Sequence, residues 1–122
     1  MTTFTTPVKS SSDLIQIAIN LPKSHLRILD TEAGMYGLRR SQFIELLFLN
    51  KIGHRSLVRL DFAPVYQFGR EELSETERFV IYVRPEVKKL FDEHLLKLGM
   101  KTTAWVVNAL NDWVGITESQ TP

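Results

Sequence analysis

Residues 14–53 read LIQIAINLPKSHLRILDTEAGMYGLRRSQFIELLFLNKIG, and residues 76–115 read TERFVIYVRPEVKKLFDEHLLKLGMKTTAWVVNALNDWVG. The two stretches align without a gap at a constant offset of 62 residues, which places Gly37 on Gly99. Few letters are identical, so the evidence for a repeat is the shared order of apolar, polar and glycine positions. A repeat of this kind decides the fold, because both copies must form the same supersecondary unit.

Each copy begins with a strict alternation of apolar residues with polar or smaller ones. A period of two with β-branched and aromatic side chains predicts a half-buried strand. Pro22 and Pro85 follow these strands and suit the first turn of a helix, where a missing N–H costs nothing. The apolar members are Ile15, Ile17, Ile19 and Leu21 in the first copy and Phe79, Ile81 and Val83 in the second.

Two helices are predicted after each strand, because apolar residues recur there at spacings of three and four. Glycines follow the helices at positions typical of a left-handed C-terminal residue. The first helices bury Leu26, Leu29, Ala33 and Tyr36 in one copy, and Val87, Leu90, Phe91, His94 or Leu95, and Leu98 in the other. The second helices bury Phe43, Ile44, Leu47, Phe48 and Ile52, and Trp105, Val106, Ala109, Leu110, Trp113 and Val114.

A single strand leaves its backbone N–H and C=O groups without partners, so the strands of the two copies are expected to pair antiparallel. The predicted fold is mainly α with a two-stranded antiparallel β-ribbon, built as one domain over residues 14–115. A two-stranded ribbon fits the major groove of B-DNA, where amides can bind adenine and guanidinium groups can bind guanine. The side chains expected on the outward face, and therefore against bases, are Gln16, Ala18, Asn20, Arg78, Val80 and Tyr82.

The turn GLRRSQFI (37–44) and its weaker counterpart GMKTTAWV (99–106) resemble the ribbon-helix-helix superfamily of Arc and MetJ-type repressors, in the form that carries two motifs in one chain. The resemblance implies that outward strand residues contact bases and that the start of each second helix holds a DNA phosphate. Free N–H groups and the helix dipole favour an anion there. The implied phosphate contacts are Arg39, Arg40, Ser41, Lys101, Thr102 and Thr103.

Two departures from the family pattern affect these expectations. The family commonly has Ser or Thr where Arg39 and Lys101 stand, which leaves Ser41, Thr102 and Thr103 as hydroxyl donors. The outward strand residues also differ between the copies, so a target site with two unlike halves is expected instead of a palindrome.

The remaining segments flank or join the motifs. We expect a flexible N-terminal arm (1–13), a first motif (14–53), a connector (54–77), a second motif (78–115) and a C-terminal tail (116–122). The first half of the connector is rich in apolar residues and is expected to pack on the repeats in extended or irregular form. The second half, from Arg70, contains Glu71, Glu72, Glu75 and Glu77 and is expected to be a solvated connector.

Composition excludes several classes of function. The chain has no cysteine, which rules out disulfides, thiolate metal sites and a cysteine nucleophile. His25, His54 and His94 lack metal-ligand spacing and are expected at the surface. No motif indicates a catalytic site or a cofactor, so we expect no enzyme, no metal and no cofactor. No apolar run approaches the roughly 20 residues of a membrane span, and a cytoplasmic protein is expected, in a host cell if the gene is viral or plasmid-borne.

The formal charge of +1 does not by itself favour a nucleic-acid partner. The charge is uneven, however, because an acidic connector masks two mildly basic repeats. The predicted function is sequence-specific binding of double-stranded DNA, as a transcriptional regulator and most simply a repressor. Alternatives are an accessory factor of a plasmid relaxosome or partition system, and a protein-interaction module that has lost DNA binding. Side-by-side self-association on DNA is a further expectation from the family.

Overall fold

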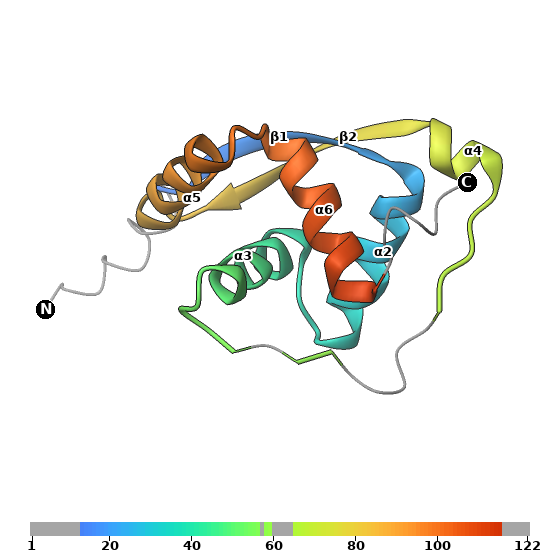
Figure 1. The fold of residues 1–122 in the computed structure, drawn as a ribbon, viewed down its shortest axis with the longest axis horizontal. Helices are drawn as coiled ribbons and strands as arrows, with labels where there is room; N and C mark the ends of the chain where they lie inside the picture. Colours follow the sequence, from blue (N-terminus) through green and yellow to red (C-terminus); the bar gives the residue numbers. More distant parts are fainter. Residues whose placement is uncertain (1–12, 57, 60–64, 116–122) are drawn as a thin grey trace, which may run out of the picture.

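The elements follow one another as two strand–helix–helix units joined by a connector. The computed structural model describes residues 13–56, 58–59 and 65–115 (Figure 1). The first unit comprises β1 (Ile15–Pro22), α2 (Lys23–Met35) and α3 (Arg40–Lys51), and the second comprises β2 (Thr76–Val83), α5 (Pro85–Leu98) and α6 (Thr102–Val114). A short helix, α4 (Arg70–Ser74), precedes β2. The predicted fold class, mainly helical with a two-stranded antiparallel sheet, is confirmed.

β1 and β2 pair antiparallel in a register that reveals the internal symmetry. Ala18 lies opposite Val80, and these two residues are also counterparts under the 62-residue repeat. The local twofold axis that relates the two units therefore passes between them. Pairs on the two sides of the axis correspond to each other, so that Asn20 opposite Arg78 is the counterpart of Tyr82 opposite Gln16.

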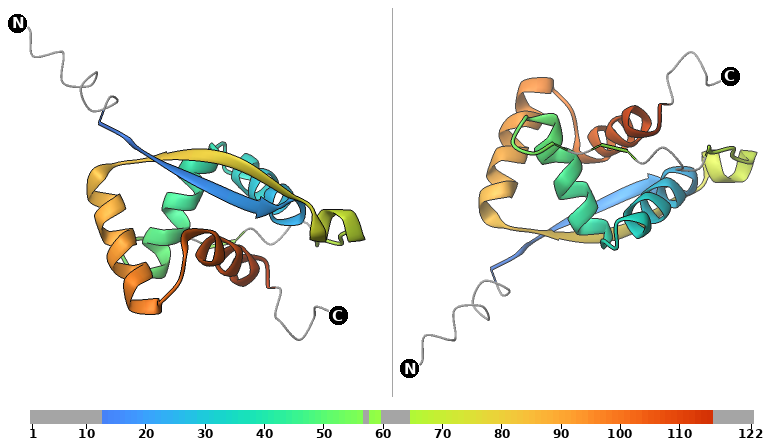
Figure 2. Two further views of the ribbon diagram at one scale, coloured as in Figure 1. Left: turned by 90° about the horizontal axis from the view of Figure 1, so that it is seen from above. Right: turned by 90° about the horizontal axis from the view of Figure 1, so that it is seen from below.

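The ribbon forms one layer and the helices form the other. Figures 1 and 2 show the helices gathered on one face of the ribbon, whereas no described element covers the opposite face. The packing crosses over between the units, because α3 of the first unit contacts β2 and α6 of the second contacts β1. Each strand is thus covered by a helix of the other unit. The inward-facing strand residues, all at most 9% exposed, are Ile17, Ile19, Leu21, Phe79, Ile81 and Val83.

The repeat extends to the backbone at the helix ends. The four glycines predicted to end helices, Gly37, Gly53, Gly99 and Gly115, all have positive φ angles, of 67°, 82°, 65° and 81°. After α2 the N–H of Leu38 donates to the Ala33 carbonyl at 2.9 Å, and after α5 the N–H of Met100 donates to Leu95 at 3.1 Å. These equivalent bonds satisfy carbonyl groups that the helix ends would otherwise leave unpaired.

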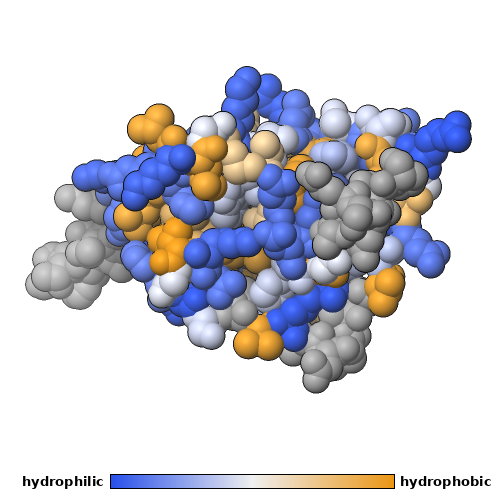
Figure 3. All heavy atoms as spheres, viewed as in Figure 1, coloured by the Kyte–Doolittle hydropathy of each residue, from blue (hydrophilic) through white to orange (hydrophobic). Residues whose placement is uncertain are grey.

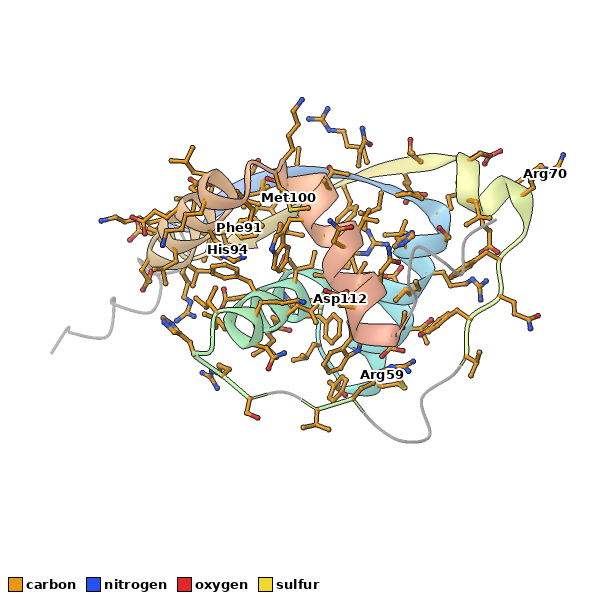
Figure 4. All side chains as sticks on the ribbon, in the orientation of Figure 1. Arg59, Arg70, Phe91, His94, Met100 and Asp112 are labelled. Atoms are coloured by element: carbon orange, nitrogen blue, oxygen red, sulfur yellow. The ribbon has the colours of Figure 1, made fainter. Side chains whose placement is uncertain are left out.

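Most of the predicted core is buried, and one prediction is wrong. Leu98 is 51% exposed, because it is the last residue of α5 and lies beyond the buried stripe of Val87, Phe91 and Leu95. His94 is half-buried, with its ring centroid 5.6 Å from that of Phe48 (Figure 4). The core also contains Ile28 and Leu49, which the helical spacing did not indicate.

The connector is ordered around α2 in the part that the structure describes. The guanidinium of Arg27 lies 4.8 Å from the centre of the Phe68 ring and donates to Glu72 and to the Gln67 carbonyl. The packing prediction is wrong for Val58 and Val65, which are 77% and 92% exposed. Residues 70–74 form the short helix α4, which buries no residue, in agreement with the solvated segment expected from Arg70 onward. The N-terminal arm up to residue 12, the C-terminal tail, Leu57 and residues 60–64 lie outside the described residues.

Glu32 of α2 is a fully buried carboxylate at the centre of a polar network. Arg59 donates to both of its oxygens, at 2.9 and 3.0 Å, and the Tyr66 hydroxyl and the Trp113 indole N–H donate at 2.5 and 2.7 Å. Burial alone would raise the pKa of Glu32, but these hydrogen bonds outweigh it and lower the pKa. Burial, and next to it the hydrogen bond to the same carboxylate, raises the pKa of Tyr66. One ionised side chain thereby joins α2, the connector and α6.

Candidate nucleic-acid interface

The six side chains predicted to contact bases all lie exposed on the uncovered face of the ribbon. Figure 2, left, shows this ribbon in front of the helices. The register arranges them in three cross-strand pairs. They are Gln16–Tyr82 at one end, Ala18–Val80 at the local twofold axis and Asn20–Arg78 at the other end.

The start of each second helix is tied to an edge of the ribbon. The backbone N–H of Tyr82 donates to the Ser41 hydroxyl of α3 at 3.0 Å, and the N–H of Asn20 donates to the Thr103 hydroxyl of α6 at 3.4 Å. The two contacts are counterparts under the repeat. Each hydroxyl accepts in this bond and keeps its own O–H for donation elsewhere. The structure therefore brings two of the three predicted phosphate-binding hydroxyls, those of Ser41 and Thr103, next to predicted base-contacting residues.

Basic residues occupy the cap positions of these two helices. Arg39 precedes α3 and Lys101 precedes α6, both with extended backbone conformations and exposed side chains. Neither side chain can accept a hydrogen bond, so neither helix has a side-chain cap. In α3 the Gln42 side chain accepts from the Arg39 N–H at 2.9 Å, which is half of a capping box. First-turn N–H groups and a positive charge thus coincide at both helix starts, as an anion requires.

Arg40 has a different environment from the other predicted phosphate contacts. Its guanidinium binds both carboxylate oxygens of Asp30, at 2.7 and 2.9 Å, and lies 4.9 Å from the centre of the Phe79 ring. The hydrogen bond to Asp30 raises the pKa of Arg40. Arg40 thus connects the start of α3 to α2, and Asp30 neutralises much of its charge. The sequence pattern did not indicate this role for Asp30.

Two open hollows flank the ribbon at positions related by the local twofold axis. Ser41 and Tyr82 line the first hollow, and their counterparts under the repeat, Thr103 and Asn20, line the second. Their chemistry differs, because apolar side chains contribute to the first and polar ones dominate the second. The first is lined by Leu14, Arg39, Arg40, Ser41, Gln42, Val80 and Tyr82, and the second by Ala18, Ile19, Asn20, Arg78 and Thr103. Of these, Leu14, Ile19 and Gln42 were not among the predicted site residues.

The three histidines lie apart from one another in sequence and environment. Within the described ranges no group of three or more His, Asp or Glu side chains is placed to hold a metal ion. His54 is exposed as predicted, whereas His25 and His94 are half-buried. His25 is bonded to Asn111 Oδ1 at 2.7 Å and to the Ser24 hydroxyl at 3.0 Å. Because Asn111 Oδ1 can only accept, Nε2 carries the proton and Nδ1 accepts from Ser24. Burial lowers the pKa of His25 more than the Asn111 bond raises it.

Hydrophilic and hydrophobic side chains are interspersed on the side of the molecule seen in Figure 3. No helix in the described part of the chain has the length and apolar character to cross a membrane. Comparison with known proteins adds no relative, since no family model, no curated protein and no solved structure matches this chain. The two strand–helix–helix units with paired antiparallel strands are nevertheless consistent with a tandem ribbon-helix-helix arrangement.

Proposed function

We propose that this chain is a tandem ribbon-helix-helix protein that binds double-stranded DNA at specific sequences and acts as a transcriptional regulator, most simply a repressor that occupies a promoter. One observation carries the proposal. The ribbon has an uncovered face with exposed amide and guanidinium side chains, and an uncapped helix N-terminus with a basic residue lies at each of its two edges.

The dimensions and chemistry of this face suit the major groove. A two-stranded ribbon can enter the groove, where Asn and Gln side chains pair with adenine N6 and N7 and Arg pairs with guanine O6 and N7. Asn20, Gln16 and Arg78 supply these groups on the outward face. Ala18 and Val80 can make apolar contact with a thymine methyl group. The helix starts at Ser41 and Thr103 would then lie against the flanking phosphates.

Electrostatics supports a binder that depends on base contacts more than on bulk charge. Seven of the basic side chains form ion pairs within the described residues, which limits the bulk positive charge available for DNA, although Arg55, Lys89 and Lys97 away from the ribbon form none. Arg39, Arg78 and Lys101 form no ion pair in that part of the chain, and all three lie at the proposed interface. A modest number of phosphate contacts predicts a shallow salt dependence of affinity.

A protein-docking role is the second candidate, and one observation favours it. Leu14, Val80 and Tyr82, which are 38%, 41% and 48% exposed, line one hollow together. An apolar contact of this kind suits a protein partner as well as sugar or thymine methyl groups.

Selection from a pool of random duplexes separates the two candidates. The protein is incubated with the pool at low salt, bound DNA is recovered by gel shift, and the cycle is repeated before sequencing. An enriched, asymmetric motif is expected. Arg78→Glu should abolish the enrichment, whereas the matched charge reversal Lys89→Glu on the exposed side of α5 should leave the motif unchanged. Failure to enrich any sequence contradicts DNA binding and leaves the docking role.

A further inference from the structure

We infer that DNA recognition is polarised along the ribbon: the Asn20–Arg78 end discriminates between base pairs, and the Gln16–Tyr82 end contributes little discrimination. The inference rests on the proposed DNA binding and adds which end of the ribbon selects the sequence. It follows from the register of the strands and from the partners of the charged side chains.

The register places two purine-directed side chains next to each other. The N–H of Asn20 points away from β2 toward Thr103, so Asn20 and Arg78 form a non-hydrogen-bonded antiparallel pair. In such pairs the side chains lie closest, with Cβ atoms about 4.5–5.5 Å apart. A side-chain amide and a guanidinium fork therefore project together, one from each strand. They can pair with adenine and guanine respectively in neighbouring base pairs.

The other end has the same geometry with weaker chemistry. The N–H of Tyr82 points toward Ser41, so Gln16 and Tyr82 also form a closely spaced pair. Tyr82 offers a single hydroxyl, which can both donate and accept and so discriminates poorly between bases. Only Gln16 can form a bidentate base contact at this end. Between the two ends, Ala18 and Val80 have no hydrogen-bonding side chain, so the centre of the ribbon adds at most methyl contacts.

The number of basic side chains outside ion pairs also differs between the two ends of the ribbon. Near Asn20, Arg78 and Lys101 carry charges that no ion pair neutralises among the described residues. Near Tyr82, Asp30 binds the guanidinium of Arg40, and Arg39 alone keeps an unneutralised charge at the start of α3. The Asn20–Arg78 end thus has one more cation outside an ion pair than the Gln16–Tyr82 end, beside the exposed carboxylate of Glu77.

The local twofold axis offers a direct test. Gln16 is the counterpart of Arg78, and Tyr82 is the counterpart of Asn20. The double substitution Gln16→Arg with Tyr82→Asn gives both ends the same pair of side chains. All four positions are exposed, so the fold is expected to be retained, which circular dichroism and thermal unfolding check. Duplex selection with this variant should yield a palindromic motif, each half resembling the strongly selected half of the wild-type motif.

The converse variant is the matched control. Asn20→Tyr with Arg78→Gln gives both ends the weaker pair, and selection should yield little base preference. In the wild type, base changes in the strong half should lower affinity by roughly 5- to 150-fold each, the equivalent of losing one bidentate contact. Tyr82→Phe should change the preference at no position by more than about 3-fold.

The outcomes distinguish a failure of DNA binding from a failure of its polarity. If the wild-type protein enriches no sequence, the proposed DNA binding fails. If it enriches a motif with equal preference in both halves, only the polarity fails. An asymmetric motif from the Gln16→Arg, Tyr82→Asn variant, or the loss of all preference in it, also overturns the polarity while leaving DNA binding intact.

Discussion

The indole N–H of Trp113 donates to the buried carboxylate of Glu32 across 81 residues of sequence. Trp113 lies in the last helix of the second unit and Glu32 in the first helix of the first unit. Arg59 and Tyr66 of the connector complete the same network. The two repeats are thus joined through a polar contact as well as through the apolar core and the ribbon.

Removing the Glu32 carboxylate should destabilise the fold strongly. Glu32→Ala leaves Arg59, Tyr66 and Trp113 without their common acceptor, and breaking a buried pair typically costs about 3–5 kcal/mol. Urea unfolding followed by circular dichroism measures the change. The control Glu93→Ala, on the exposed side of α5, should alter stability by no more than about 0.5 kcal/mol. Equal effects of the two substitutions would show that the network contributes nothing specific.

The same carboxylate predicts a dependence of stability on acid. Because the pKa of Glu32 is lowered in the folded protein, the unfolded chain binds a proton first as the pH falls. The stabilisation is fully present above the unfolded pKa of about 4.5 and is lost as the pH falls through the folded value. Unfolding free energies measured between pH 7 and pH 3 should decline less for Glu32→Gln than for the wild type. A parallel decline in both proteins would contradict this assignment.

His25 predicts a second change in stability at higher pH. Burial lowers its pKa below the ordinary value of 6.5, so the unfolded state binds the proton more tightly than the folded state. Stability is therefore lost as the pH falls from above 6.5 toward the folded pKa. The imidazole resonances of His25, followed by NMR, should titrate below 6.5 in the folded protein and near 6.5 in urea. Titration of the folded protein at or above the urea value would be inconsistent with the burial of His25.

Two glycine substitutions should act in opposite directions. Gly99 has a φ of 65°, a region that costs an L-residue roughly 1–2 kcal/mol, so Gly99→Ala should lower the melting temperature. Gly34 lies within α2, and a Cβ there would meet no atom within 4 Å. Gly34→Ala should therefore stabilise the protein by about 0.4–1 kcal/mol. Differential scanning calorimetry compares them, and stabilisation by both would argue against the left-handed end of α5.

A contact with phosphate should be recognisable from its salt dependence. Lys101→Ala should weaken binding to all sequences alike and should reduce the slope of log K against log salt by roughly 0.9. The control is Arg55→Ala, because Arg55 is exposed beyond the C-terminal end of α3, whereas the ribbon contacts its N-terminal end. Fluorescence anisotropy at several salt concentrations gives both slopes. A change in base preference with an unchanged slope would instead assign Lys101 to base contact.

Local periodicity predicted most of the fold, since strand alternation, helical stripes and helix-ending glycines all depend on residues close in sequence. The network around Glu32 depends on residues 27, 34 and 81 positions away, and no local pattern contains such contacts. One signal was nevertheless present. Glu32 stands four residues after Ile28 and three after Leu29, on the apolar side of its helix, where a charge requires a buried partner.

The candidate site was also predictable only in part: the outward residues could be predicted from the sequence, but their cross-strand pairing could not. Alternation placed Asn20 and Arg78 on the outward face, which the structure bears out by their exposure. The cross-strand pairs depend on the register between β1 and β2. The sequence of either strand alone does not determine this register. The Arg40–Asp30 pair joins two helices of one unit through a turn, so its geometry depends on how α3 folds back on α2.

Covalent joining of the two units affects how such a protein can change over time. In a symmetric homodimer, one mutation in the ribbon alters both ends at once, and any gain at one half of a DNA site is tied to the other half. In this chain each outward side chain occurs once, so a mutation at Arg78 leaves Gln16 as it was. The inward-facing positions, such as Ile19 and Ile81, still share one core and remain constrained together. The fold therefore permits the outward side chains at the two ends of the ribbon to diverge separately, without a cost in packing.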